Sequence, residues 1–233
     1  MLQLSNVSFR YRSKPILNEL SFEFPIGQII GLVGENGSGK STLLKIMVGL
    51  LSATRGEVRL NNIPVTRRSA DNIAFLPDTD LFFDFYTGEQ LFQFYSSQYT
   101  DFSYDKACIV AEYLHVDKNT KLKYLSKGNR GRMKMAATLG REVSFYVMDE
   151  PFAGLDPMAR ESLIRGLIQF TDNETQTIIL STHEVHEVEP ILDQILLLQN
   201  GSIIAHENVE SIRDFTNQDA VQWMKTFNKE RVK

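Results

Sequence analysis

The strongest constraint on the fold lies in eight consecutive residues, Gly34-Glu-Asn-Gly-Ser-Gly-Lys-Ser41. A glycine, four variable residues, a second glycine, a lysine and a hydroxyl residue make the pattern of a phosphate-binding loop, the P-loop. The apolar stretch 28–34 comes before it and predicts a buried strand, and apolar residues at helical spacing over 43–51 follow it. Strand, glycine loop and helix in this order are the context in which the motif holds a polyphosphate.

Each residue type of the loop suits this task. The three glycines allow the backbone to turn so that its N–H groups face a phosphate, at the positive end of the following helix. We expect the Lys40 ammonium to reach the β- and γ-phosphates and the Ser41 hydroxyl to bind Mg²⁺.

The composition favours a globular chain without a basic surface. The 233 residues are 42% hydrophobic, enough for a full core, and the formal net charge of -4 disfavours nucleic acid as a partner. The single cysteine, Cys108, has no disulfide partner, which fits a reducing compartment. No stretch approaches the ~18 apolar residues of a membrane span, so we expect a cytosolic chain unless a partner holds it at a membrane.

Residues 2–33 alternate between apolar and polar and predict an antiparallel lead-in to the nucleotide core. Tyr11 lies in the polar connection between the first two strands. Its ring has two interpretations, an ordinary strand tyrosine or a platform that stacks on an adenine base.

The composition changes after two further predicted strands, 56–62 and 72–77. Aromatic residues crowd into 82–99, and helical spacing continues towards residue 140. We therefore predict an α/β fold: one domain, 1–233, with a P-loop nucleoside triphosphatase core and a parallel sheet. A helical subdomain, 79–140, is inserted within a nucleotide-binding lobe of 1–78 and 141–233. The aromatic residues fit either a core or an exposed groove for a partner helix.

A second glycine-containing stretch, Leu125-Ser-Lys-Gly-Asn-Arg-Gly-Arg132, precedes another predicted helix. It has two interpretations, a capped helix start with solvated basic side chains or a second anion site at a helix N-terminus.

Two carboxylates follow the apolar run Phe145–Met148 and are expected at the carboxyl edge of a buried strand, where α/β sheets bind ligands. Asp149 is placed to hold Mg²⁺. Glu150, one residue further, is free to accept a proton from an attacking water.

The last third of the chain predicts three more features. Asp156 is expected as the N-cap of a helix that starts at Pro157. Ser181 and Glu184 fit a capping box after the strand 177–181, which would place His183 at a helix N-terminus, facing the phosphates. A hairpin with an Asn-Gly turn, 195–204, and an amphipathic tail helix, 219–233, complete the chain.

The order of these motifs resembles the ATP-binding cassette of ABC transporters over essentially the full length. Tyr11 resembles the A-loop, 34–42 Walker A, 125–129 the signature, 145–150 Walker B, 153–156 the D-loop and His183 the switch histidine.

The resemblance implies an ATPase with ATP and Mg²⁺ as ligands, working as the motor subunit of a membrane transporter. Two cassettes, identical or homologous, would form a head-to-tail dimer on transmembrane permease subunits, at the cytoplasmic face of the membrane and without nucleic acid. The implied catalytic residues are Lys40, Glu150 and His183, and the implied metal ligands are Ser41, Asp149 and Asp78. The implied nucleotide contacts are Tyr11, Gly34, Glu35, Asn36, Gly37, Ser38, Gly39, Lys40, Ser41, Thr42, Ser126, Gly128 and Asn129.

The chain departs from the family pattern in the Q-loop and the signature. Asp78 stands where the family has glutamine, Lys127 and Asn129 replace two signature residues, and Gly131 lies where a further glutamine is usual. These departures are similar to those of bacterial exporter cassettes whose proposed cargo includes drugs and amphipathic or antimicrobial peptides. Asp78 itself has two interpretations, a Mg²⁺ contact that couples the lobes or a cap on the next helix.

Other P-loop classes fit less well. A ribosome-associated cassette ATPase would carry two cassettes, and a DNA-repair cassette would carry a long coiled coil, and neither pattern is present. A GTPase would need an aspartate after its Asn-Lys pair, whereas Asn228-Lys229 is followed by Glu230.

Overall fold

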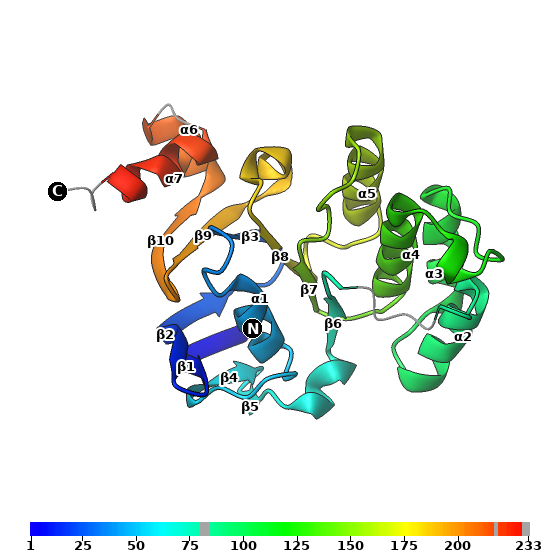
Figure 1. Cartoon of the computed structure of the whole chain (residues 1–233), viewed down its shortest axis with the longest axis horizontal. Coiled ribbons are helices and arrows are strands. Elements are labelled where there is room, and N and C mark those ends of the chain that lie inside the picture. The colour runs from blue at the N-terminus through cyan, green and yellow to red at the C-terminus, as the bar shows by residue number, and fades with distance from the viewer. Residues whose placement is uncertain (80–83, 217–218, 230–233) are drawn as a thin grey trace.

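The computed structural model describes residues 1–79, 84–216 and 219–229 and contains two sheets (Figure 1). The antiparallel sheet has the order β2-β1-β4-β5, and the larger sheet has the order β10-β9-β3-β8-β7-β6. In the larger sheet β9, β3, β8, β7 and β6 run parallel, and β10 pairs antiparallel with β9. The predicted fold class, α/β with a parallel sheet and antiparallel N-terminal strands, is confirmed.

The strands are β1 (Leu2–Tyr11), β2 (Lys14–Phe24), β3 (Ile29–Val33), β4 (Arg55–Leu60), β5 (Ile63–Pro64), β6 (Ile73–Leu76), β7 (Phe145–Asp149), β8 (Thr177–Thr182), β9 (Gln194–Gln199) and β10 (Ser202–Asn208). The α-helices are α1 (Lys40–Met47), α2 (Gly88–Gln98), α3 (Tyr104–Tyr113), α4 (Lys127–Leu139), α5 (Pro157–Gln169), α6 (Val209–Thr216) and α7 (Ala220–Lys229). Short 3₁₀ helices are η1 (Arg67–Asp71), η2 (Leu122–Tyr124), η3 (Val185–Glu187) and η4 (Glu189–Ile191).

The parallel sheet is buried on both faces because each central strand sends alternate side chains to two different cores. On β3, Ile30 and Leu32 pack with the leucines of α1 and with the antiparallel sheet, whereas Ile29 and Val33 belong to the core that includes α4 and α5. This period-2 alternation fixes α1 on one face of the sheet. The carboxyl ends of β3, β7 and β8 therefore converge beside the start of α1.

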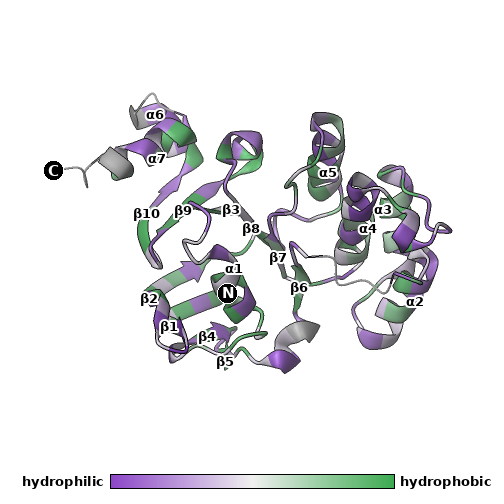
Figure 2. Cartoon of the chain, viewed as in Figure 1, coloured by the Kyte–Doolittle hydropathy of each residue, from purple (hydrophilic) through white to green (hydrophobic). Residues whose placement is uncertain are grey.

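The helices α2, α3 and α4 gather at one end of the molecule, and α6 and α7 lie at the opposite end (Figure 1). Polar and apolar residues are mixed along α2 (Figure 2), whereas the buried residues of α4, 133 and 135–139, gather in its second half. Among the described helices, none has the length and apolar run that crossing a bilayer requires.

The aromatic segment contributes both to the core and to the lining of a cavity. Phe92 is fully buried, whereas Phe94, Tyr95 and Tyr99 line a cavity of about 270 Å³ between β6, α2 and α4. Phe85 is 64% exposed. Phe82 and Phe83, which the sequence analysis placed in the same segment, lie outside the described residues.

Several local predictions are confirmed. Asp156 caps α5, with its carboxylate accepting from the Ala159 N–H, and Pro157 is the first helical residue. The hairpin β9–β10 turns at Asn200 and Gly201, which both have positive φ, as an Asn-Gly turn of type I′ requires.

One local prediction is wrong. Ser181 does not cap a helix, because it is the fifth residue of β8, and the 3₁₀ helix η3 begins only at Val185. Of the two interpretations of Asp78, a cap on α2 does not hold, because the N-cap of α2 is Thr87, in a capping box with Gln90. Helix α6 was not predicted, and the predicted tail helix, 219–233, continues beyond Lys229 to residues that lie outside the described part of the chain.

Candidate active site

The glycines of the P-loop are required by its geometry. Gly39, directly before α1, has φ 110°, and Gly34 has φ 154°. A Cβ at Gly34 would collide with the carbonyl oxygen of Leu198, whereas Gly37 faces open space. The loop thus combines close packing against β9 with an open side on which a ligand can approach the backbone.

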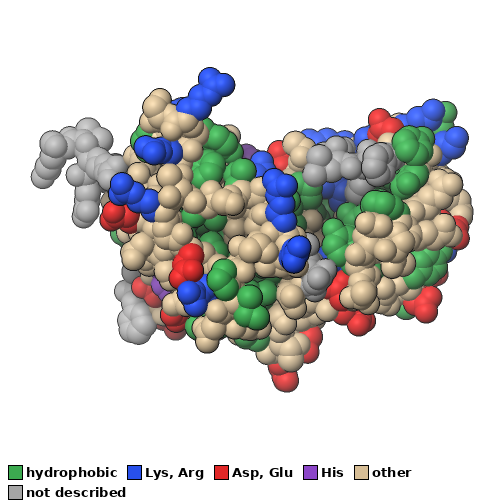
Figure 3. All heavy atoms as spheres, turned by 90° about the horizontal axis from the view of Figure 1, so that it is seen from below, with side chains coloured by type: hydrophobic (Ala, Val, Ile, Leu, Met, Phe, Trp, Pro, Cys, Tyr) green, Lys and Arg blue, Asp and Glu red, His purple; other side chains and the backbone are tan. Residues whose placement is uncertain are grey.

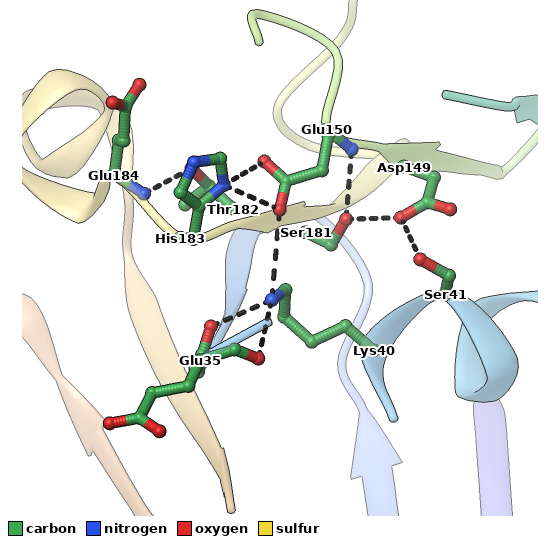
Figure 4. Close-up of polar contacts among 10 residues, drawn as sticks. Glu35, Lys40, Ser41, Asp149, Glu150, Ser181, Thr182, His183 and Glu184 are labelled. Carbon is green, nitrogen blue, oxygen red and sulfur yellow. Dashed lines mark hydrogen bonds and ion pairs between the residues drawn. The ribbon is translucent and has the colours of Figure 1, made fainter. Parts of the chain in front are cut away.

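Lys40 is the first residue of α1, and its side chain folds back over the loop. Its Nζ donates to the carbonyl oxygens of Gly34 at 2.7 Å and Glu35 at 3.2 Å, and lies 3.8 Å from Oε1 of Glu150 (Figure 4). Burial lowers the pKa of Lys40, and the nearby carboxylates of Glu150 and Asp149 oppose this shift. The ammonium is therefore a largely desolvated cation, and phosphate oxygens could replace the loop carbonyls as its partners.

Two hydroxyls meet the carboxylate of Asp149 at the end of β7. Ser41, from the start of α1, donates to Oδ1 at 3.0 Å, and Ser181, from β8, donates to the same oxygen at 2.7 Å (Figure 4). The register of the sheet causes the second contact, because Asp149 and Ser181 are partners in the β7–β8 ladder. Asp149 is 3% exposed, so its orientation is fixed by these bonds.

Glu150 adopts a conformation that non-glycine residues rarely hold, with φ 48°. Its N–H donates to Oγ of Ser181 at 2.9 Å, and its carboxylate is turned towards the end of β8. There, Nδ1 of His183 lies 3.0 Å from both carboxylate oxygens. Strain of this kind is stored at functional sites when the surrounding contacts hold it in place.

Ser181 is the residue of this group whose function the sequence analysis missed. It bonds to both acidic residues, through Oδ1 of Asp149 and the backbone of Glu150. Its position at the end of a strand was visible in the sequence, but its neighbour across the sheet was not. Because β7 and β8 are parallel, their register alone places Ser181 beside Asp149.

Other predicted contacts lie apart from this group. Tyr11 is 50% exposed and packs edge-on against Phe9, which leaves its ring accessible. Ser126 caps α4 by accepting from the Asn129 N–H at 3.3 Å. Within the described part of the chain, no hydrogen bond joins Ser126, Gly128 or Asn129 to Lys40 or Glu150.

Lys127 and Asp78, two of the residues that depart from the family pattern, contact other parts of the chain. The side chain of Lys127 extends over Gly154, so that a Cβ added to Gly154 would collide with Nζ of Lys127. Asp78 is exposed, and its carbonyl oxygen accepts from Lys134 Nζ at 3.0 Å. Acidic and basic side chains are interspersed on the face shown in Figure 3.

The residues present fit a magnesium nucleotide. Ser41 and Asp149 offer two oxygens side by side, and among the described residues no three His, Cys, Asp or Glu side chains cluster for a metal. Mg²⁺ is commonly held by one or two protein oxygens together with substrate phosphates and water. A P-loop with its lysine supplies the phosphate contacts. The fold and the site together define a P-loop nucleoside triphosphatase.

Comparison with known proteins specifies the family. Residues 17–153 match the family model for the ABC transporter, so the chain belongs to the ABC transporter ATP-binding proteins. It is 33% identical over 227 residues to the Nod factor export ATP-binding protein I of Burkholderia orbicola, with 90% of this chain and 73% of that protein covered. It is 31% identical over 222 residues to the manganese transport system ATP-binding protein MntB of Listeria innocua, with 90% of each covered. It is 30% identical over 240 residues to the lantibiotic transport ATP-binding protein SrtF of Streptococcus pyogenes, with 94% of this chain and 97% of that protein covered.

Solved structures agree on the fold. The ATP-binding subunit of an ABC transporter superimposes with a TM-score of 0.83 at 24% identity, with 98% of both chains covered. A dimeric cassette in a post-hydrolysis state, bound to ADP and Pi, superimposes with a TM-score of 0.79 at 21% identity, with 89% of this chain and 98% of that chain covered. The prediction that the chain is an ABC ATPase, the ATP-binding subunit of a transporter, is confirmed.

Proposed function

We propose that this ABC ATPase hydrolyses MgATP with Glu150 as general base and powers the export of cargo through separate membrane subunits. The observation that carries the proposal is the position of the Glu150 carboxylate. It lies 3.0 Å from His183 and 3.8 Å from the ammonium of Lys40, beside the open side of the P-loop. A carboxylate so placed can accept a proton from a water molecule that attacks the phosphate held by Lys40.

The other residues of the group hold the substrate and orient the base. The loop residues 34–42 would bind the phosphates through their backbone N–H groups, and Lys40 would bind the β- and γ-phosphates. His183 would keep the Glu150 carboxylate oriented and report on the γ-phosphate. Tyr11, with its accessible ring, would stack on the adenine.

Ser41 and Asp149 are the proposed ligands of Mg²⁺, and Asp78 is a proposed third contact from the start of the helical segment. When bound, Mg²⁺ would neutralise charge on the phosphate oxygens during transfer. Ser181 would hold Asp149 and the Glu150 backbone in register with each other.

The working unit is proposed to be a dimer of cassettes, identical or homologous. Ser126, Gly128 and Asn129 would complete the nucleotide site of the second subunit, in a head-to-tail arrangement. The dimeric cassette among the similar structures supports a dimer in general. The position of Ser126 as the N-cap of α4 supports the choice of Ser126, Gly128 and Asn129, because the backbone N–H groups at the start of this helix can face an anion held by a partner subunit.

Residues 79–140 are proposed to form a helical subdomain that receives the membrane subunits in the cavity lined by Phe94, Tyr95 and Tyr99. The chain would then sit at the cytoplasmic face of the membrane, held there by those subunits. Two of the similar proteins are named for Nod factor export and lantibiotic transport, and a third for manganese transport. We favour an exporter of drugs or of amphipathic or antimicrobial peptides, because of the residues at Asp78, Lys127 and Asn129.

The oligomeric state of Glu150→Gln with MgATP tests this proposal. Removing the base while keeping the phosphate contacts should trap a closed dimer, because ligand bound only to the closed state stabilises it by roughly 4 kcal/mol at a thousandfold excess over Kd. Size-exclusion chromatography should show a dimer with MgATP and a monomer without nucleotide. A variant that stays monomeric at saturating MgATP contradicts the proposed dimer site.

A further inference from the structure

The segments that carry Glu150 and His183 leave the sheet from neighbouring strands and then separate. After β7 the chain turns through residues 150–156 into α5, and after β8 it enters η3 and η4. The ladder between β7 and β8 fixes the two segments up to Asp149 and Ser181. The positions of the segments that carry Glu150 and His183 must therefore depend on contacts made outside the sheet.

Arg160, in the first turns of α5, contacts both segments. Its Nη1 lies 2.5 Å from Oε1 of Glu187 in η3, and the two side chains are 19% and 11% exposed. Its Nη2 donates to the carbonyl oxygen of Leu155 at 3.4 Å. One planar guanidinium thus joins the turn that follows Glu150 to the 3₁₀ helix that follows His183.

The opposite side of the same segment is held by the C-terminal helices. Glu189 is 8% exposed, and its Oε1 accepts from Nη2 of Arg213 at 3.1 Å. Its Oε2 accepts from the backbone N–H of Ala220, at the start of α7, at 3.2 Å. Glu187 and Glu189 therefore attach the segment to α5 on one side and to α6 and α7 on the other.

We propose that Arg160, through Glu187, is a positioning residue for the segment that starts at His183. The inference rests on the proposed roles of Glu150 and His183. When the turn after Glu150 moves, the guanidinium moves the histidine segment with it, and the 3.0 Å contact between imidazole and carboxylate is kept. Loss of the ion pair lets the two segments move independently.

A role in fold stability alone fits the local chemistry less well. Nε of Arg160 is buried and has no hydrogen-bond partner among the described residues, and a buried donor without a partner destabilises the folded state. An apolar side chain would avoid this cost. The presence of an arginine at this position is therefore explained by its two terminal nitrogens, which connect Glu187 to the carbonyl oxygen of Leu155.

A double-mutant cycle on the full chain tests the inference, with Arg160→Met, Glu187→Gln and the combination. We expect kcat for ATP hydrolysis to fall by about tenfold to a hundredfold in each single variant, since small misplacements of reacting groups have effects of this size. KM for ATP should stay within about twofold, because the P-loop contacts are untouched. The double variant should be no slower than the slower single variant, because the residues act as a pair.

The same helix offers a matched control. Arg165 and Glu161 form an ion pair of the same length, 2.5 Å, but their side chains are 67% and 62% exposed. Arg165→Met and Glu161→Gln should keep the parent kcat. Unchanged kcat in Arg160→Met and Glu187→Gln, even with a lower melting temperature, would overturn the inference, as would strictly additive losses in the double variant.

Glu150→Gln in the same assay separates this inference from the proposed function. If Glu150→Gln hydrolyses ATP at the parent rate, the assignment of the base is wrong. If Glu150→Gln is inactive while Arg160→Met matches the parent, only the positioning role of Arg160 is wrong.

Discussion

His183 and Glu150 meet directly after the ends of β8 and β7, with the imidazole Nδ1 3.0 Å from each carboxylate oxygen. The carboxylate also faces Lys40, whose Nζ is 3.8 Å away. Glu150 therefore lies between His183, which is proposed to orient it, and Lys40, which is proposed to hold the phosphates. Each partner can be removed separately, and the expected results differ.

Replacing His183 with alanine should slow ATP hydrolysis on the order of a hundredfold, the lower end of the range for groups that assist proton transfer. ATP binding should persist, because the P-loop does not depend on the imidazole. His206→Ala is the control, since His206 lies on β10 and pairs with Gln194. Equal rates in His183→Ala and the parent would exclude the orienting role.

Lys40→Ala should lose ATP affinity and turnover together. In the proposed function the lysine would contact the phosphates already in the ground state, so its removal should affect binding as well as the transition state. Isothermal titration calorimetry with ATP measures the first effect and a phosphate-release assay the second. Unchanged ATP affinity would mean that the ammonium keeps its contacts with the carbonyl oxygens of Gly34 and Glu35 when nucleotide binds.

The stability of the fold at alkaline pH should depend on Tyr146. Burial raises the pKa of Tyr146 to about 12, whereas an unfolded tyrosine titrates near 10. The folded state therefore keeps a proton that the unfolded state loses. The corresponding stabilisation is complete below pH 10 and is lost as pH rises to 12, by about 3 kcal/mol.

Tyr146→Phe removes this titration and the hydrogen bond from the hydroxyl to the Arg141 carbonyl oxygen. At neutral pH we expect a loss of about 1 kcal/mol in the free energy of unfolding. Between pH 10 and 12 the variant should lose stability less steeply than the parent. Parallel curves for the two proteins in urea denaturation would show that Tyr146 does not titrate in this range.

Asp78→Gln should change how strongly the membrane subunits stimulate ATP hydrolysis, while ATP affinity stays nearly constant. Asp78 joins β6 to the helical segment, and its carbonyl oxygen accepts from Lys134 at the cavity proposed for those subunits. Thr87 rather than Asp78 caps α2, so we expect the melting temperature not to fall by the amount typical of a lost cap. ATPase rates with and without reconstituted membrane subunits decide this. An unchanged ratio of stimulated to basal rate contradicts the coupling role.

The sequence predicted best where the chemistry is local. The P-loop, the strand that ends in Asp149 and the cap at Asp156 each lie within one short stretch, and the structure places them as expected. Ser181 was misassigned because its partners come from another strand, through the register between β7 and β8. The contact between Arg160 and Glu187 has no sequence signal, because it depends on how α5 and η3 leave the sheet.

The aromatic segment shows the same limit. Its composition allowed a core or a groove for a partner helix. In the structure Phe92 belongs to the core, whereas Phe94 lines a cavity. Helical spacing alone could not distinguish the buried Phe92 from Phe94 at the cavity, because this difference depends on where α4 and β6 pack against α2.

The rate of ATP hydrolysis by Glu150→Gln, measured together with its ATP affinity, tests the central assignment most directly. Glutamine keeps the shape of the side chain but cannot accept the proton, so the rate should fall by ~10²–10⁴ while ATP affinity stays within about twofold. Hydrolysis at the parent rate with normal ATP binding would show that Glu150 is not the base.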